Sequence, residues 1–204
     1  MNKKKPHVCP VERSGSLDSK LRKLFQNPKK LLKPYIRKGM TVLEIGCGPG
    51  FFTLDMAEMV GESGKIIAVD LQEGMLEKVK SKISGTQFEQ RIKLHKCSEI
   101  SIGISEQVDF VLLFYMVHEV PDQPKLFSQL ASILKPDGQI LIAEPPFHVS
   151  ARKFQRMLQQ ARDQGFINLQ GPKILFSKTA ILTAMSRPGL STPRLAPQQS
   201  MQET

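Results

Sequence analysis

Cysteine is scarce in this 204-residue sequence, and the chain has no long apolar run. The three cysteines, Cys9, Cys47 and Cys97, form no Cys-x-x-Cys pair and no histidine cluster with zinc spacing. This number and spacing argue against a disulfide framework or a structural metal, and favour reduced thiols in an intracellular protein. No stretch approaches the roughly 18 to 20 apolar residues of a membrane span, and the N-terminus lacks the apolar segment of a secretory signal. The sequence therefore predicts a cytoplasmic protein without a metal site.

Several catalytic signatures are missing as well. The sequence contains no Gly-x-Ser-x-Gly, no phosphate-binding Gly-Lys-Ser/Thr and no His-Glu-x-x-His. Hydrophobic residues make up 40% of the chain and charged residues 24%, which is typical of a soluble globular protein. The length fits one domain with a substantial core.

The net charge of +10 is confined to the beginning of the chain. Residues 1–38 contain twelve lysines and arginines but only Glu12 and Asp18, whereas basic and acidic residues are equal in number over residues 39–204. A concentrated positive charge can attract nucleic acid or another polyanion. A solvated helix face would give the same pattern, so both interpretations stay open.

What the sequence does contain is a strand followed by a glycine-rich turn. Residues 40–45 are apolar apart from Thr41 and Glu44, and Gly46, Gly48 and Gly50 follow at alternate positions. Glycine lets the backbone turn sharply and approach a ligand closely. Residues 51–60 then have helical periodicity, so backbone N–H groups would point at whatever lies at the start of that helix.

This pattern closely resembles motif I of the class I S-adenosylmethionine-dependent methyltransferases. Glu44 stands two residues before the first glycine, and a second acid, Asp70, follows Gly50 by twenty residues. The dinucleotide signature Gly-x-Gly-x-x-Gly is absent. The resemblance spans residues 40–182 and is closer to the ubiquinone/menaquinone-type, small-molecule branch. The shared phrases are Val-Leu-Glu-Ile-Gly-Cys-Gly-Pro-Gly and Leu-Lys-Pro-Asp-Gly-Gln.

Strand and helix patterns alternate after the glycine turn, which predicts an α/β fold with right-handed crossovers. The resemblance implies a Rossmann-like, mostly parallel sheet with helices on both faces and an antiparallel hairpin at its C-terminal end. The expected strands are 40–45, 65–69, 91–96, 109–114 and 139–143, then the hairpin strands 166–169 and 173–182. The expected helices are 17–26, 28–32, 51–60, 73–83, 124–134 and 151–164, and residues 135–138 are expected to form a tight turn.

The first expected helix has an apolar stripe with no partner in its own segment. We therefore expect residues 7–32 to pack across the ligand cleft, with His7 and Cys9 nearest the methyl group. The predicted organisation is a basic helical arm or lid, a methyltransferase domain and a disordered tail, which comprise residues 1–38, 39–185 and 186–204 in that order.

The resemblance implies S-adenosyl-L-methionine as cofactor and S-adenosyl-L-homocysteine as product. A carboxylate at Asp70 can accept hydrogen bonds from both hydroxyls of a ribose. The family usually has an aspartate after strand three, where this chain has Cys97, Ser98 and Glu99, so either Ser98 with backbone groups or Glu99 would hold the adenine. The expected cofactor-binding residues are Glu44, Gly46, Cys47, Gly48, Gly50, Phe51, Asp70, Leu71, Met75, Cys97, Ser98 and Phe114, the last through its carbonyl.

Candidate catalytic residues follow the fourth and fifth strands. They are Tyr115, His118 and Glu144. His118 could serve as a base toward the acceptor or bond across the start of a helix. Glu144 could orient a substrate amine or hydroxyl, or cap a neighbouring backbone group. Methyl transfer needs no fixed triad, because positioning alone can lower a barrier by about 7 to 11 kcal/mol.

The sequence thus predicts a methyltransferase that acts by in-line displacement on a small-molecule acceptor. An RNA or protein methyltransferase that uses the basic residues 1–38 is an alternative, although no Asn-Pro-Pro-Tyr follows strand four. A cofactor-binding homologue without turnover is the other alternative, since the strand-three aspartate is missing.

Overall fold

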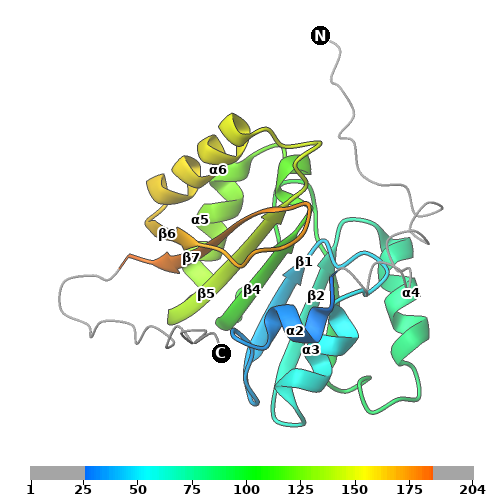
Figure 1. The fold of residues 1–204 in the computed structure, drawn as a ribbon. Coiled ribbons are helices and arrows are strands. Elements are labelled where there is room, and N and C mark those ends of the chain that lie inside the picture. Colours follow the sequence, from blue (N-terminus) through cyan, green and yellow to red (C-terminus); the bar gives the residue numbers. More distant parts are fainter. Residues whose placement is uncertain (1–25, 186–204) are drawn as a thin grey trace.

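The computed structural model describes residues 26–185, which form a twisted sheet with helices on both faces (Figure 1). The strands are β1 (Thr41–Ile45), β2 (Lys65–Asp70), β3 (Ile92–Lys96), β4 (Val108–Phe114), β5 (Leu134–Glu144), β6 (Phe166–Gln170) and β7 (Lys178–Ala184). The helices are α2 (Pro28–Leu32), α3 (Thr53–Val60), α4 (Glu73–Ile83), η2 (Val117–Glu119), α5 (Gln123–Ile133) and α6 (Ala151–Asp163). The expected helix 17–26, apart from Gln26, and the expected tail 186–204 lie outside the described residues.

The strand order is β3-β2-β1-β4-β5-β7-β6, and only β7 runs antiparallel to its neighbours. From β1 the chain builds the sheet outward through β2 and β3, then returns to place β4 on the other side of β1. The connections therefore leave the carboxyl ends of β1 and β4 in opposite directions, which opens a crevice between them. The predicted Rossmann-like sheet with its antiparallel hairpin is confirmed.

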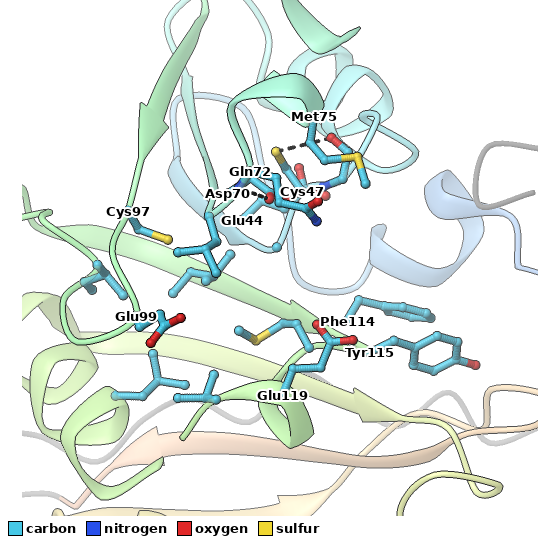
Figure 2. A pocket seen from close by; sticks show the side chains of 18 of the residues that line it. Glu44, Cys47, Asp70, Gln72, Met75, Cys97, Glu99, Phe114, Tyr115 and Glu119 are labelled. Carbon is cyan, nitrogen blue, oxygen red and sulfur yellow. Dashed lines mark hydrogen bonds between the residues drawn. The ribbon is translucent and has the colours of Figure 1, made fainter. Parts of the chain in front are cut away.

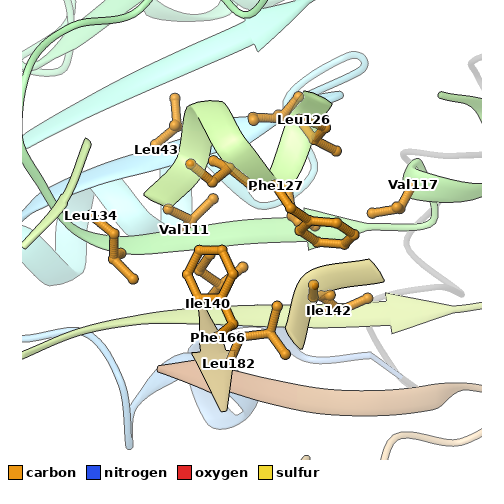
Figure 3. Close-up of a cluster of buried hydrophobic side chains, with 14 of the residues drawn as sticks. Leu43, Val111, Val117, Leu126, Phe127, Leu134, Ile140, Ile142, Phe166 and Leu182 are labelled. Carbon is orange, nitrogen blue, oxygen red and sulfur yellow. The ribbon is translucent and has the colours of Figure 1, made fainter. Parts of the chain in front are cut away.

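Each face of the sheet carries its own apolar core. Alternate residues of a strand point to opposite faces, so Val111 joins the cluster under α5 and α6, and Leu112 joins the cluster under α2, α3 and α4. Figure 3 shows the first cluster, in which Phe127 of α5 lies beside Phe166 of β6 with their ring centroids 6.4 Å apart. Burial on both faces explains why the central strands read as continuous apolar runs.

The short helix α2 illustrates how local sequence sets an element boundary. The Asn27 side chain accepts a hydrogen bond from the backbone N–H of Lys30 at 3.1 Å, and Pro28 occupies the first helical position. Both features satisfy or remove donors that a helix start leaves unpaired. The predicted helix 28–32 is confirmed with these bounds.

Two predicted elements are wrong. Residues 135–138, expected to be a turn before the fifth strand, lie within β5. Val108 pairs with Leu134 and Phe110 pairs with Gln139, so these four residues of β5 lie between two consecutive pairs. The extra residues form an irregularity opposite Asp109, whose carboxylate accepts a hydrogen bond from Lys135 Nζ at 2.8 Å.

The last strand also begins later than expected. Residues 173–177 form a loop, and β7 runs from Lys178 to Ala184 in register with β5. The sequence 173–177 is apolar enough to resemble a strand, yet only Ile174 of its three large apolar residues is buried. Apart from the start of β5 and the helix 17–26, which is not described, the other expected elements agree with the structure within two residues at each end.

The packing of Phe127 predicts a measurable loss of stability. Phe127 is fully buried between α5 and the sheet, so Phe127→Ala should lower the free energy of unfolding by about 3 to 5 kcal/mol, as expected for an unfilled aromatic site. Ser128→Ala, on the exposed side of the same helix, should change it by less than about 0.5 kcal/mol. Urea unfolding measures both, and equal midpoints would contradict this account of the core.

Candidate functional site

A cleft of about 410 Å³ opens at the carboxyl ends of β1, β2 and β4, where the strand order reverses (Figure 2). Its volume lies within the range of small-molecule sites. One wall comes from the glycine loop after β1 and the segment after β2, and the other from residues that follow β3, β4 and β5. Parallel strands deliver all of these loops to one edge of the sheet, which is why residues distant in sequence meet here.

The glycine loop is held close to the segment after β4. Gly46 has φ +72°, and a Cβ atom at this position would lie 2.9 Å from the Cβ of Met116. A side chain at Gly46 would therefore push the two walls of the cleft apart. The backbone N–H groups of Gly46 and Cys47 donate to the carbonyl of Val69 at 2.8 and 3.0 Å, which also ties the loop to the end of β2.

Asp70 occupies the position predicted for it at the end of β2. Its Oδ2 accepts a hydrogen bond from the N–H of Gly48 at 2.9 Å, and its Oδ1 accepts one from the N–H of Gln72 at 2.9 Å. Burial raises the pKa of the Asp70 carboxyl, and the backbone donors oppose that rise. The N–H of Leu71 is a third backbone donor to this carboxylate, whose two oxygens have four lone pairs in total, so acceptor capacity remains.

Eleven of the twelve expected cofactor residues line this cleft. Glu44 is buried there and accepts a hydrogen bond from the Thr53 hydroxyl at 2.6 Å, so it joins the end of β1 to the start of α3. Gly50 does not line the cleft. Its φ is +88° and a Cβ would come within 3.1 Å of Val79, so this glycine allows the loop to pack on α4.

The two described cysteines lie in the same cleft as free thiols. Burial raises the pKa of the Cys97 thiol and raises that of Cys47 well above its usual value, with Glu44 adding to the effect at Cys47. Both thiols are therefore neutral at physiological pH and contribute apolar surface rather than charge.

His118 and Glu144, predicted separately, form one pair. Glu144 Oε2 lies 2.5 Å from His118 Nδ1, and Oε1 accepts a hydrogen bond from the His118 backbone N–H at 3.2 Å. Glu144 is fully buried and lies behind His118 rather than on the cleft surface, whereas the histidine ring lines the cleft. The carboxylate thus acts on the ring, and any contact with a ligand falls to the histidine.

The surroundings of His118 act on its pKa in opposite directions. Burial lowers the pKa, but the hydrogen bond and negative charge of Glu144 outweigh it, with help from Glu119, so the pKa is raised above its ordinary value. Lys153 opposes this rise. The ring of His148 stands edge-on to that of His118, with centroids 5.5 Å apart.

Tyr115 lines the cleft, but its hydroxyl takes part in structural contacts. It accepts a hydrogen bond from Gln26 Nε2 at 2.9 Å, lies 2.6 Å from Ser177 Oγ and donates to the carbonyl of Phe176 at 3.2 Å. Its φ is +61°, which is strained for a bulky side chain. Tyr115 therefore joins the segments before α2 and before β7 at the edge of the cleft.

Glu119 and Gln72 also line the cleft, as does His148, although sequence reasoning did not select Glu119 or Gln72. Glu119 is half-buried, and burial raises its pKa while His118 lowers it. Its place directly after His118 was the available signal. Residues 26–185 contain no cluster of histidine, cysteine and acidic side chains that could hold a metal ion.

The cleft combines a buried carboxylate at Asp70, a glycine loop that allows close backbone approach, and apolar walls. A family model described as a methyltransferase domain matches residues 36–171, which is more than half of the chain. The chain belongs to this methyltransferase family. The predicted family and its cofactor, S-adenosylmethionine, are thereby confirmed.

Individual relatives agree with this family. Demethylmenaquinone methyltransferase of Lactobacillus johnsonii is 30% identical over 118 residues, which are 57% of this chain and 48% of that protein. The corresponding enzyme of Bacillus cereus is 28% identical over 109 residues, or 53% of this chain and 46% of that protein. The chain spans about half the length of the curated relatives it matches.

Solved structures show the same fold. A SAM-dependent methyltransferase from Aquifex aeolicus superposes with a TM-score of 0.78 at 24% identity, covering 88% of this chain and all of that one. At these identities the likeness concerns the fold alone. None of the helices in residues 26–185 is long and apolar enough to cross a membrane.

The His118–Glu144 pair predicts a measurable pKa. Glu144→Gln keeps a hydrogen-bond acceptor but removes the charge, so it should lower the pKa of His118 toward or below its ordinary value. In the unchanged protein, protonated His118 should stabilise the fold below about pH 6.5, and this contribution should be lost as pH rises through the raised pKa. NMR titration of the ring protons measures the shift, with His148→Gln to assign the signals. A pKa unmoved by Glu144→Gln would contradict the pairing.

Proposed function

We propose that this chain transfers the methyl group of S-adenosylmethionine to a small-molecule acceptor that loses a proton during the reaction. The observation that carries the proposal is the His118–Glu144 pair facing the same cleft as the glycine loop and Asp70. S-adenosylmethionine supplies a methyl group already activated on a sulfonium. The protein must then hold the acceptor in line, exclude water and take up a proton.

Residues of both walls would bind the cofactor, with its ribose and methionine portion against the first wall. Asp70 would accept hydrogen bonds from the ribose hydroxyls, and the backbone from Gly46 to Gly48 would lie against the methionine portion. The carbonyl of Phe114 would receive the ammonium group. Leu71, Met75, Cys97 and Ser98 would enclose the adenine, with Glu99 as the alternative partner of its amino group.

The second wall would bind and deprotonate the acceptor. Because Glu144 lies at Nδ1, the neutral ring of His118 carries its proton there and leaves the Nε2 lone pair available to the cleft. A proton taken up at Nε2 gives an imidazolium that the buried carboxylate stabilises. Glu144 is then a positioning residue, and Tyr115 supports the edge of the cleft through its three contacts.

The charges of the cleft favour a neutral or cationic small molecule over nucleic acid. Glu99, Glu119 and Asp122 line it, with Lys125 as the one lysine among the lining residues. A polyanion would meet like charge at this wall. Most of the basic residues on which a nucleic-acid substrate would depend belong to residues 1–25, outside the described part of the chain.

The domain organisation and location expected from the sequence stay proposals. Residues 7–25 of the expected lid, with His7 and Cys9, lie outside the described residues. The side chain of Gln26 contacts Tyr115 at the cleft, and this contact supports the proposal that the arm lies near the cleft. We propose that the methyl transfer takes place in the cytoplasm.

Asp70 offers a direct test of cofactor binding. Asp70→Ala should weaken S-adenosylhomocysteine binding more than tenfold, because charge-assisted hydrogen bonding to the ribose would be lost. Isothermal titration calorimetry measures this, with Glu106→Gln as the control, since Glu106 pairs with Lys65 outside the cleft. Equal affinities of the Asp70 variant and the unchanged protein would show that the ribose lies elsewhere.

Turnover tests the role of His118. With labelled S-adenosylmethionine and a small-molecule cell extract, His118→Gln should lower label transfer about 100-fold or more, yet leave S-adenosylhomocysteine affinity within about threefold. Glu144→Gln should move the lower inflection of the pH–rate profile to lower pH, in step with the pKa of His118. If the His118→Gln variant transferred label as fast as the unchanged protein, His118 would not be the general base. If the unchanged protein labels nothing but binds cofactor, the chain is a homologue without turnover.

A further inference from the structure

Two exposed phenylalanines lie together at the rim of the cleft. Of the ten phenylalanines in residues 26–185, seven are buried, whereas Phe147 is 85% and Phe176 is 64% exposed. Their ring centroids are 6.5 Å apart. Leu175, half exposed, precedes Phe176 and completes an apolar rim, which we define as Phe147, Leu175 and Phe176.

The apolar rim belongs to the mouth of the cleft. Phe147 stands between Pro145 and His148, both of which line the cleft. Phe176 accepts, through its carbonyl, a hydrogen bond from the hydroxyl of Tyr115, another lining residue. An apolar surface here faces whatever approaches the site.

The backbone holds Phe176 in this exposed position at a cost. Its φ is +56°, a left-handed conformation that bulky side chains rarely adopt. Ile174, two residues earlier, is buried in the core, and the N–H of Ser177 donates to the carbonyl of Ile174 at 3.1 Å. The loop is thus anchored, and it presents two large apolar side chains to solvent although burying them would be favourable.

The segments that carry the apolar rim are predominantly basic. Residues 145–185 contain six lysines and arginines but a single acid, Asp163, whereas residues 39–144 contain nine basic and fifteen acidic residues. Arg152, Lys153 and Arg156 are exposed on the first two turns of α6, which begins four residues after Phe147. Lys173 is exposed two residues before Leu175. The acids of the cleft instead come from the segments after β3 and β4.

We propose that the apolar rim and the cations of α6 dock this protein on an anionic lipid bilayer, with the cleft mouth toward the membrane surface. Apolar side chains beside lysines and arginines are the features that bind such interfaces, since the rings enter the headgroup region and the cations attract acidic lipids. A nucleic acid would also meet the cations, but Leu175 has no hydrogen-bonding or stacking role there. Membrane docking itself does not depend on the proposed function. Only the reaction that the cleft would carry out at the membrane surface rests on it.

Vesicle flotation of the full chain tests the docking. The unchanged protein should bind vesicles of equal parts phosphatidylglycerol and phosphatidylcholine, and should bind phosphatidylcholine alone far more weakly. Phe147→Ser combined with Phe176→Ser should lower the partition coefficient about tenfold or more. Arg152→Gln with Arg156→Gln should also lower it, whereas the matched loss of two exposed charges in Arg37→Gln with Lys38→Gln, before β1, should not.

The absence of tryptophan from the sequence permits a site-specific probe. Phe147→Trp should show a blue shift of emission on anionic vesicles, whereas Met185→Trp, exposed beyond the far end of β7, should not. Isothermal titration with S-adenosylhomocysteine should give unchanged affinity for the double phenylalanine variant, which keeps this test separate from that of the cleft.

Four outcomes would overturn the docking proposal. Undiminished vesicle binding by the phenylalanine variant would assign binding to another part of the chain, such as the basic residues 1–25. Binding of single-stranded RNA without vesicle binding would make the surface a nucleic-acid platform. A dimer that dissociates on Phe147→Ser would make it an interface between copies. Failure to bind vesicles at low salt would contradict membrane docking but would leave the proposed methyl transfer in the cleft unaffected.

Discussion

The structure depends on one constraint, the adjacency of two parallel strands whose connections leave in opposite directions. β1 leads outward to β2 and β3, whereas β4 leads to β5, so no connection covers the crevice between their carboxyl ends. The close contact of Gly46 with Met116 sets the distance between the two walls there. Every feature assigned to the cleft follows from this arrangement, because each loop that reaches it ends a strand of the same sheet.

The two walls of the cleft differ in the chemistry that they offer. On one wall, backbone N–H groups and Asp70 provide directed hydrogen bonds around the glycine loop. On the other, a buried carboxylate holds a histidine at the surface. A fully buried charge needs hydrogen-bonded partners to be tolerated, and Glu144 finds two of them in the ring and backbone of His118. The contacts that offset the cost of burying the Glu144 carboxylate also fix the orientation and the tautomer of the His118 ring.

The rim of the cleft combines features that stability alone does not require. Phe176 is exposed in a strained conformation, and the cations of α6 have no acidic neighbours in sequence apart from Asp163 at the end of the helix. Backbone strain persists where the surrounding structure over-determines it, and Ile174 and Tyr115 supply that constraint here.

The sequence by itself determined the α/β class and the positions of Asp70 and the glycine loop, because these depend on local periodicity and on spacing along one chain. Its resemblance to motif I of a known family indicated the cofactor. Only the tertiary structure decided that His118 and Glu144 act as one unit, since they lie 26 residues apart on loops that the sheet brings together. It also decided that Gly50 serves packing, that residues 135–138 continue β5, and that residues 173–177 form a loop. These outcomes rest on contacts between distant segments, and single-chain patterns carry no record of which distant residue lies opposite.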